Sequence, residues 1–390
     1  MKILFITPDF YPKSTGFANA ALNLINAINK NYDGDVELFA FTSTPLGKYE
    51  ELNHINVIRY NESSFNNRFT YVFNQRSKFV FLKKIIDKEK FDIIFFETNT
   101  FPFLQNWILK RYGNKVFVRI HSTADTEVVV YGQQKSLLEK KQKKSIYDFM
   151  KNVSNIISTS DYYLDFVKKF YLHENVYSIW NDKTYNIIYN TAGDGIKQAP
   201  HINENVFITM GKMSSNGLTQ KGILDLLKAV YCLKKQSEIP IDFKVVIIGD
   251  GEMRGRIDNY IKRLCIESYV QIVSSASHEE VFEYISKSKA VVLLSRYEGQ
   301  SMFITESLAI GKPLIITKDN GMEHMVEEGV NGFLVKTGDY KAAADILKKV
   351  MNMSSEKIDE MGVASRKKYD SNYSSMAVCN QFKDIVDMIY

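Results

Sequence analysis

Short apolar runs alternate with longer amphipathic stretches along almost the whole of this 390-residue chain. In the first half, runs rich in β-branched and aromatic residues predict strands at residues 3–7, 36–41, 93–97, 116–121 and 155–159. Segments between them, such as residues 18–29 and 78–88, have the apolar spacing of helices. Buried strands that alternate with helices indicate parallel sheets covered by helices on both faces.

A second series of strands follows the same scheme, at residues 206–210, 244–249, 270–273, 290–295, 313–317 and 332–335. Each series is long enough for one doubly wound unit, so the sequence predicts an α/β fold with two Rossmann-like domains facing each other across a cleft. Gly193, Gly195 and Pro200 interrupt the periodicity between the two series. We therefore expect a first domain over residues 1–190, a linker over 191–204 and a second domain over 205–370.

The composition excludes several other classes of protein. The chain is 45% hydrophobic and 24% charged, as ordinary globular proteins are. Its three scattered cysteines (Cys232, Cys265 and Cys379) contain no CxxC pair and suit a reducing compartment. No run approaches the roughly 18 apolar residues of a transmembrane helix, and the N-terminal apolar run is too short for a signal peptide. These features predict a soluble, cytoplasmic protein.

The positive charge is concentrated in the first half of the chain. Residues 1–190 hold 25 basic and 19 acidic residues, and within them residues 76–151 hold 16 and 8. Nucleic-acid binding is disfavoured because lysine outnumbers arginine 40 to 10, and arginine is the better fork for bases and phosphates. Solvated helix surfaces are the simplest interpretation. Attraction to an anionic membrane surface is the functional alternative.

The most informative segment, residues 295–306, has the sequence Ser-Arg-Tyr-Glu-Gly-Gln-Ser-Met-Phe-Ile-Thr-Glu. A strand is expected to end near Ser295, Gly299 allows a tight turn, and a helix is expected to begin near Gln300. The first N–H groups of a helix lack partners and attract anions, so this turn suits a diphosphate. Glu298 before the helix and Glu306 within it can face one ligand. The alternative is two solvated carboxylates around an ordinary helix start.

A second strand-to-helix connection carries two lysines. A strand is expected to end at Met210, directly before Gly211 and Lys212, and a helix is expected to begin near Gly222, directly after Lys221. If both lysines enter the cleft from one loop, they can neutralise a diphosphate and stabilise it as it departs. The alternative is two exposed lysines in a lysine-rich protein.

His121 stands at the end of a predicted strand, where it can hydrogen-bond a polar ligand or have a purely structural role. The loop of residues 9–17 contains Gly16 at the start of a predicted helix and can approach a substrate closely. Asp33-Gly34-Asp35 has the D-x-D pattern of a metal site, but it lies between a helix and a strand and is better explained as a turn. No histidine, cysteine or aspartate cluster has metal-ligand spacing, so no metal is expected.

These motifs resemble those of the retaining glycosyltransferases of family 4, which have the two-domain GT-B fold. The resemblance covers most of the chain and is strongest in residues 205–336. Its markers are Gly211-Lys212, Lys221-Gly222, Gly249-Asp250-Gly251, the pair Glu298 and Glu306, Gly321 to Glu323, Asn331-Gly332-Phe333, His121 and Ile188-Tyr189-Asn190. The resemblance implies that the first domain lies on the acceptor side, and that a helix at residues 371–390 crosses back onto it.

The resemblance also implies roles for individual residues. Glu306 would hold the ribose of the donor, Glu298 would hold the donor sugar, and His121 would contact that sugar near the reacting carbon. Lys212 and Lys221 would bind the diphosphate, together with the amides of Gln300, Ser301 and Met302. Gly16, Gly211 and Gly299 would also belong to the donor-binding site. The sequence departs from the family in having one glycine near residue 16 instead of two. It also has a lysine at 212, where the family commonly has an arginine. A lysine makes one contact with a diphosphate where an arginine makes two.

The implied reaction moves a sugar from a nucleotide-diphosphate sugar, a UDP-sugar by this resemblance, to a glycan or lipid-linked acceptor in cell-surface polysaccharide synthesis. No pair of carboxylates suits double displacement as in retaining glycosidases. This is compatible with front-face attack, in which the departing phosphate takes the acceptor proton, without a metal or other cofactor. Two alternatives remain, a GT-B sugar-nucleotide epimerase and an inactive GT-B protein that binds another transferase. The expected location is cytoplasmic, peripheral at the inner face of the membrane.

Overall fold

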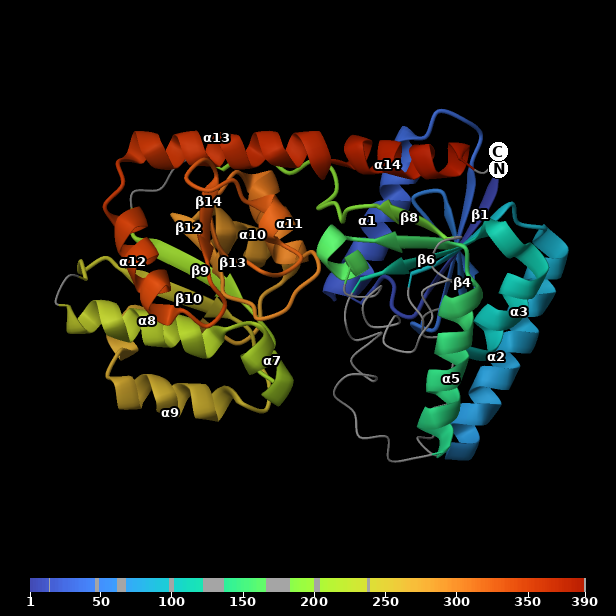
Figure 1. The fold of residues 1–390 in the computed structure, drawn as a ribbon, viewed down its shortest axis with the longest axis horizontal. Helices are drawn as coiled ribbons and strands as arrows, with labels where there is room; N and C mark the ends of the chain where they lie inside the picture. The colour runs from blue at the N-terminus through green and yellow to red at the C-terminus, as the bar shows by residue number, and fades with distance from the viewer. Residues whose placement is uncertain are drawn as a thin grey trace. The chain divides into compact units, whose positions relative to one another are not determined.

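A computed structural model describes residues 1–13, 15–45, 49–61, 68–97, 102–121, 137–165, 183–199, 204–236 and 239–388. The chain packs into two units, Met1–Gly193 with Ser375–Tyr390, and Asp194–Ser374 (Figure 1). The domain and linker boundaries at residues 190, 204 and 370 stay a prediction.

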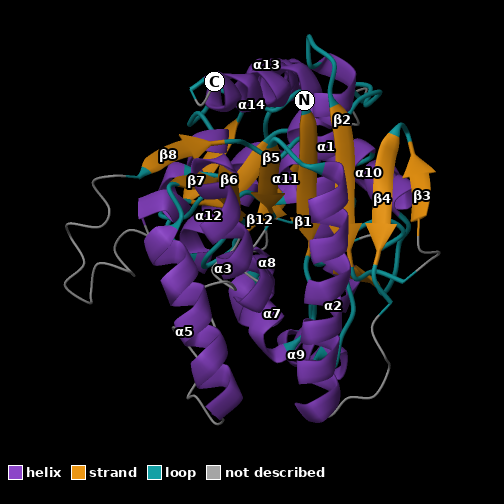
Figure 2. Ribbon diagram, turned by 90° about the vertical axis from the view of Figure 1, so that its right-hand side faces the viewer, coloured by secondary structure: helices purple, strands orange, loops and turns teal. Residues whose placement is uncertain are grey.

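The first unit is built on one eight-stranded sheet, with the strand order β3-β4-β2-β1-β5-β6-β7-β8 that Figure 2 shows from the side. The strands are β1 (Lys2–Thr7), β2 (Glu37–Thr42), β3 (Tyr49–Leu52), β4 (Ile55–Arg59), β5 (Ile93–Phe96), β6 (Val116–Ile120), β7 (Asn155–Ser158) and β8 (Thr184–Ile187). All neighbouring strands are parallel except β3 and β4. The five strands predicted in this half are confirmed, and β3, β4 and β8 were not predicted.

The antiparallel edge of this sheet corrects the expectation of purely parallel sheets. Strands β3 and β4 form a hairpin, because Asn53 and His54 between them have φ angles of 52° and 65°. Two residues with positive φ make the turn that matches the twist of paired antiparallel strands. Asparagine adopts this conformation readily, but histidine in place of the usual glycine hides the turn in the sequence.

Helices cover both faces of the first sheet. Helices α1 (Gly16–Asn31) and α14 (Ser375–Asp387) pack against one face, with side chains such as Ile25 and Phe382 in a shared core. Helices α2 (Arg68–Glu89), α3 (Pro102–Tyr112) and α5 (Leu137–Asn152) supply the core on the other face (Figure 1). The central strands, such as β1, β5 and β6, are buried on both sides, which explains why they appear in the sequence as continuous apolar runs.

The second unit has a six-stranded, fully parallel sheet with the order β11-β10-β9-β12-β13-β14. Its strands are β9 (Val206–Met210), β10 (Lys244–Ile248), β11 (Val270–Val273), β12 (Ala290–Leu293), β13 (Leu314–Thr317) and β14 (Gly332–Val335), all six of which were predicted. Its helices are α7 (Ser215–Gln220), α8 (Ile223–Lys235), α9 (Arg254–Leu264), α10 (His278–Ser286), α11 (Met302–Ile310), α12 (Tyr340–Met351) and α13 (Ser355–Asn372). This is the strand order of a doubly wound nucleotide-binding fold, so the predicted fold class is confirmed.

The topology of each sheet identifies where a ligand can bind. The order in which successive strands are added to the sheet reverses between β9 and β12 in the second unit, and between β1 and β5 in the first. Ligands of open α/β sheets bind at the carboxyl ends of strands at such a switch point. The loops after β9 and β12 contain the residues singled out in the sequence, from Gly211 to Lys221 and from Ser295 to Met302. Among the described residues, no helix is both long enough and apolar enough to cross a membrane.

Replacing Phe382 with alanine tests whether α14 is an integral part of the first unit. The Phe382 side chain is 1% exposed and lies 6.2 Å from the ring of Phe95, measured between centroids. Loss of a buried phenylalanine removes apolar contacts and leaves a cavity, so we expect the free energy of unfolding to fall by about 3–5 kcal/mol. Equilibrium urea unfolding measures this change. Met376→Ala on the same helix is the control, since Met376 is 53% exposed; equal, small effects of both would contradict the packing.

Candidate functional site

Close backbone contacts hold together the loops that follow β9 and β10. The amide of Gly211 donates to the carbonyl of Ile248 at 3.0 Å, and the amide of Met213 donates to the carbonyl of Asp250 at 2.9 Å. A Cβ atom on Gly249 would lie 2.0 Å from the carbonyl oxygen of Gly211, and Gly249 has a φ of 153°. Only glycine allows this approach and this backbone conformation.

The loop after β12 is held by bonds to both of its neighbours. The amide of Arg296 donates to the carbonyl of Gln220 at the end of α7, at 2.8 Å, and the amide of Gly321 donates to the carbonyl of Glu298 at 2.8 Å. The Asn320 side chain donates to the carbonyl of Ser295 at 3.2 Å. The loop that contains Glu298 and the buried Gly299 is therefore fixed against the connections that follow β9 and β13.

Glu298 and Lys221, which the sequence placed on separate loops, form an ion pair. Their Oε2 and Nζ atoms lie 2.6 Å apart, and the side chains are 14% and 21% exposed. The Lys221 side chain packs against Gly211, where a Cβ atom would lie only 2.9 Å from Cβ and Cγ of the lysine. Gly211 thus leaves the space that lets Lys221 reach Glu298.

The prediction that Lys212 and Lys221 share one loop is wrong, because helix α7 lies between them. Ser214 caps this helix by accepting a hydrogen bond from the amide of Gly217 at 3.1 Å. A Cβ atom on Gly217 would lie 2.2 Å from the carbonyl oxygen of Lys212, so the turn closes tightly over the lysine backbone. The Lys212 side chain is exposed, whereas Lys221 is half-buried beside Glu298.

Helix α11 begins at Met302, directly behind this loop, with Ser301 as its N-cap residue. Gln300, Ser301 and Met302 are all buried, and the Ser301 side chain makes no capping hydrogen bond. The Gln300 side chain donates to Thr305 Oγ1 at 3.1 Å. A helix N-terminus without a side-chain cap presents N–H donors and the positive end of its dipole to an anion.

Glu306 lies one turn further along α11, and its side chain is 4% exposed. Its Oε1 atom lies 2.8 Å from Nε2 of His278, the first residue of α10. The hydrogen bond to Glu306 raises the pKa of His278 despite the opposing effect of burial. His278 was not singled out in the sequence, although it follows Ser277, which forms a capping box with Glu280.

Two of the predicted site residues belong to the first unit. His121 follows β6, and its Nε2 atom contacts the carboxylate of Glu97, the residue after β5. The ring of Phe17, next to Gly16 at the start of α1, packs edge-on against the His121 ring with centroids 4.8 Å apart. The structure therefore brings Gly16 and His121 to one place, together with Glu97, which was predicted only as the end of a strand.

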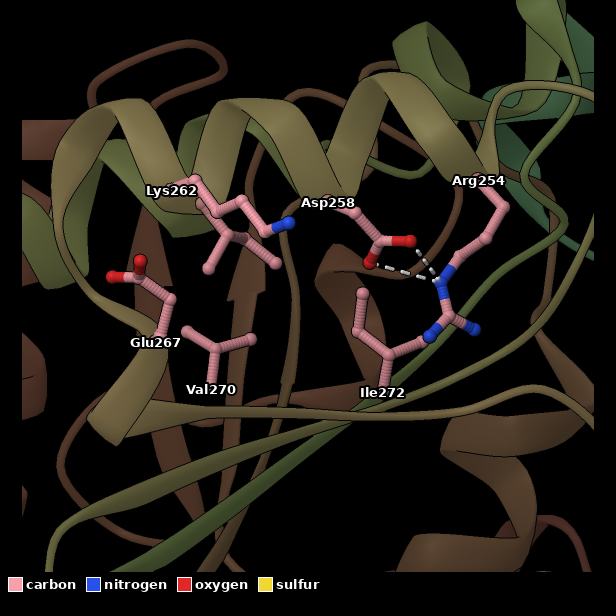
Figure 3. Close-up of a pocket in the computed structure, with 7 residues that line it drawn as sticks. Arg254, Asp258, Lys262, Glu267, Val270 and Ile272 are labelled. Carbon is pink, nitrogen blue, oxygen red and sulfur yellow. Dashed lines mark hydrogen bonds and ion pairs between the residues drawn. The ribbon is translucent and has the colours of Figure 1, made fainter.

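Two further features lie apart from these residues. A pocket of about 310 Å³ between α9 and β11 is lined by Arg254, Asp258, Ile261, Lys262, Glu267, Val270 and Ile272, and none of them was predicted to bind the donor (Figure 3). Asp33-Gly34-Asp35 lies in the connection between α1 and β2, where the sequence predicted a turn. Its Asp33 carboxylate is paired with Lys383 of α14.

The chain matches two models of glycosyltransferase families. Residues 15–181 match glycosyltransferase family 4, and residues 196–368 match glycosyl transferases group 1. A relative from Methanocaldococcus jannaschii, "Uncharacterized glycosyltransferase MJ1178", is 26% identical over 99% of each chain. The enzyme GalNAc-alpha-(1->4)-GalNAc-alpha-(1->3)-diNAcBac-PP-undecaprenol alpha-1,4-N-acetyl-D-galactosaminyltransferase of Campylobacter jejuni is 24% identical over 90% of this chain and 89% of its own.

The fold also matches solved structures over the whole chain. The Anabaena protein Alr3699/HepE, solved in complex with UDP and glucose, superposes with a TM-score of 0.70 over 99% of each chain at 16% identity. Two Rossmann-like units of this topology define the fold class, GT-B. The matches to both families place the chain within it: it belongs to the group 1 glycosyltransferases and is a transferase.

The pair of His278 and Glu306 makes the stability of the second unit depend on pH. Because the pKa of His278 is raised in the folded protein, the pair stabilises the fold below the ordinary histidine pKa, and this contribution is lost as the pH rises through the raised value. We expect the difference in free energy of unfolding between wild type and His278→Gln to be larger at about pH 5.5 than at about pH 8.5.

Urea unfolding of both proteins at the two pH values measures this difference. His54→Gln is the matched control, because His54 forms a comparable pair with Glu51 but is 88% exposed, and an exposed pair contributes little. A difference for His278→Gln that grows with rising pH would contradict the prediction.

Proposed function

We propose that this glycosyltransferase moves a sugar from a UDP-sugar, with retention of configuration, to a glycan or lipid-linked saccharide in cell-surface polysaccharide synthesis. The observation that carries the proposal is the ion pair of Lys221 and Glu298, which stands beside the uncapped start of α11 at the switch point of the second sheet. A cation, a helix N-terminus and a carboxylate together suit a sugar joined to a diphosphate.

In this proposal the diphosphate binds between Lys221 and the first amides of α11. The Lys221 ammonium group and the helix dipole stabilise the negative charge that grows on the diphosphate as the sugar leaves. Lys212 is exposed and long enough to add a second cation after its side chain reorients. The backbone bonds that hold the loop of Glu298 to its neighbours keep this loop in place during the reaction.

The two carboxylates have separate roles. Glu306 is almost fully buried and engages His278 through one oxygen, so its carboxylate is fixed to accept hydrogen bonds from the ribose hydroxyls. Glu298 stands before the helix and is held by Lys221, where it can accept a hydrogen bond from a hydroxyl of the donor sugar. For His121 we propose, as the resemblance to family 4 implies, a hydrogen bond with a hydroxyl group of a sugar.

The mechanism we propose is front-face substitution. The bond between the anomeric carbon and the diphosphate oxygen breaks as the acceptor hydroxyl attacks the same face, and the departing phosphate oxygen takes the acceptor proton. The enzyme's role is to stabilise charge and to orient both substrates, which needs neither a carboxylate nucleophile nor a divalent metal.

Two relatives support the choice of substrates. HepE was solved with UDP and glucose, which favours a UDP-sugar as the donor. The name of the Campylobacter enzyme gives its acceptor as a saccharide on PP-undecaprenol. This favours a lipid-linked acceptor here. With such an acceptor, the enzyme would act in the cytoplasm at the inner face of the membrane.

Helix α2 is the surface we propose for contact with the membrane. The aromatic residues Phe79 and Phe81 of this helix do not face outward, because they pack against Trp107 and Tyr60. Exposed apolar and basic residues share the outer surface of the helix instead: Phe73 (64% exposed), Val80 (46% exposed), Arg76, Lys83 and Lys84. Each basic residue close to an anionic surface contributes on the order of 1 kcal/mol, so a few suffice for reversible binding.

Replacing Lys221 with alanine tests the diphosphate site. Because one charged donor to the leaving group is lost, we expect kcat/KM for the nucleotide sugar to fall about 100-fold or more. Hydrolysis of a panel of nucleotide sugars, assayed with and without EDTA, measures this and is expected to proceed fully in EDTA. Lys235→Ala, an exposed lysine at the end of α8, is the control. Equal activity of both variants would refute the role of Lys221 in binding the diphosphate. Activity that requires added metal would refute the metal-independent mechanism.

Co-sedimentation with lipid vesicles tests the membrane surface. We expect the protein to bind vesicles that contain phosphatidylserine at low salt and to leave them at high salt, because screening weakens charge attraction. The double variant Phe73→Ser/Lys84→Glu should bind several-fold less. Its control, Ile241→Ser/Lys367→Glu, changes one exposed apolar and one exposed basic residue of the second unit. Equal binding by both double variants would rule out α2 as the contact.

A further inference from the structure

A cluster of buried charges surrounds His121 in the first unit. Arg119 of β6 and Glu97 after β5 are both fully buried, and Arg119 Nη1 lies 3.4 Å from Glu97 Oε2. The same carboxylate oxygen contacts Nε2 of His121, whose side chain is 7% exposed. Because β5 adjoins β1 at the switch point of the first sheet, this cluster occupies the position where a doubly wound unit binds its ligand.

Arg119 and Glu97 do not satisfy each other completely, and Arg119 Nε is also buried without a hydrogen-bond partner in the described part of the chain. Arg119 Nη2 also donates to the carbonyl oxygens of Ile188 and Tyr189, both at 3.1 Å, and to Asn190 Oδ1 at 2.8 Å. The second oxygen of Glu97, Oε1, is buried without a hydrogen-bond partner in the described part of the chain. A buried, partly unpaired carboxylate is costly, so a role in charge balance alone does not explain why Glu97 reaches His121.

The charges around the ring determine which nitrogen carries its proton. Burial raises the pKa of Glu97, but Arg119 and His121 outweigh it and hold the pKa below its usual value, so the carboxylate is ionised and can only accept. Burial, and then the charge of Arg119, lowers the pKa of His121 in spite of Glu97, so the ring is neutral. A neutral ring that donates from Nε2 to a carboxylate has an unprotonated Nδ1, which is a hydrogen-bond acceptor.

We propose that Glu97 is a positioning residue that holds His121 as the Nε2–H tautomer, so that Nδ1 accepts a hydrogen bond from a hydroxyl group of the bound sugar. The inference rests on the proposed function, since it assumes that His121 meets a sugar. Phe17 packs against the ring and limits its rotation, so the tautomer and the orientation are fixed together. Arg119 keeps the carboxylate ionised and thereby acts on His121 through Glu97.

The nitrogen spectrum of the histidine rings tests the tautomer without any substrate. The ¹⁵N-labelled full chain contains six histidines, and the His121 signals are assigned as those missing in His121→Gln. Long-range ¹H–¹⁵N correlation at neutral pH is expected to show Nε2 protonated and Nδ1 unprotonated in the wild type. In Glu97→Gln, whose amide can donate or accept, both tautomers are expected. A wild-type ring protonated on Nδ1 or on both nitrogens overturns the proposal, even if Glu97→Gln does not fold.

Kinetics of the same variants test the connection to the sugar. Glu97→Gln is expected to lower kcat/KM by about 10- to 100-fold, the usual effect of losing a group that orients a ligand-binding histidine. Because Glu97 acts through His121, adding Glu97→Gln to His121→Gln should cost nothing further. Glu89→Gln, which loses a carboxylate paired with Lys2 on the surface of this unit, is the control.

The outcomes separate this inference from the proposed function. Equal losses from Glu97→Gln with and without His121 would show a general structural role and overturn the inference. Absence of wild-type activity with every nucleotide sugar would instead refute the proposed function, while the nitrogen spectrum would still decide the tautomer.

Discussion

The site of the second unit depends on backbone segments that approach more closely than side chains normally permit. Gly249 lies against the carbonyl of Gly211, and Gly222, with a φ of 65°, lies against the carbonyl of Leu294 at the end of β12. A Cβ atom at Gly222 would be 1.9 Å from that oxygen. Because the strand-end loops touch through their main chains, the positions of Lys221 and Glu298 are set by backbone geometry and not by side-chain packing alone.

This backbone frame makes it possible to hold charged groups in a partly buried place. A carboxylate removed from water needs a cation or several donors, or its pKa rises until it is neutral. The structure meets this need pairwise, with Lys221 beside Glu298 and His278 beside Glu306. A ligand that binds these carboxylates must share them with their partners, so Lys221 and His278 also affect how strongly each carboxylate accepts a hydrogen bond from a hydroxyl group.

The sequence predicted the fold class, and it singled out nine residues for the candidate site of the second unit, because their signals are local. An apolar strand, a glycine turn and a helix start follow one another directly, as in residues 290–306, and each can be recognised within a few positions. The sequence did not reveal His278 and Glu97 as site residues, because their partners, Glu306 and His121, are 28 and 24 residues away. The order of the strands in the sheet brings each pair together. Helix α7 escaped because six residues are too few to show a helical period.

The two switch points show how one topology serves two different tasks. Both sheets have a central strand order that reverses at the same relative place, so both offer a ligand site by geometry alone. In the second unit, glycines and a helix N-terminus surround the strand ends, which favours an extended anion that lies against the backbone. In the first, the charges of Glu97 and Arg119 compensate each other, and the neutral ring of His121 stands at the edge of the pair.

A neutral acceptor suits a sugar hydroxyl better than a phosphate, because hydroxyl groups donate hydrogen bonds and phosphate oxygens accept them. The two units therefore place different side chains at the same topological position, a helix N-terminus with glycines in one and a neutral histidine ring in the other.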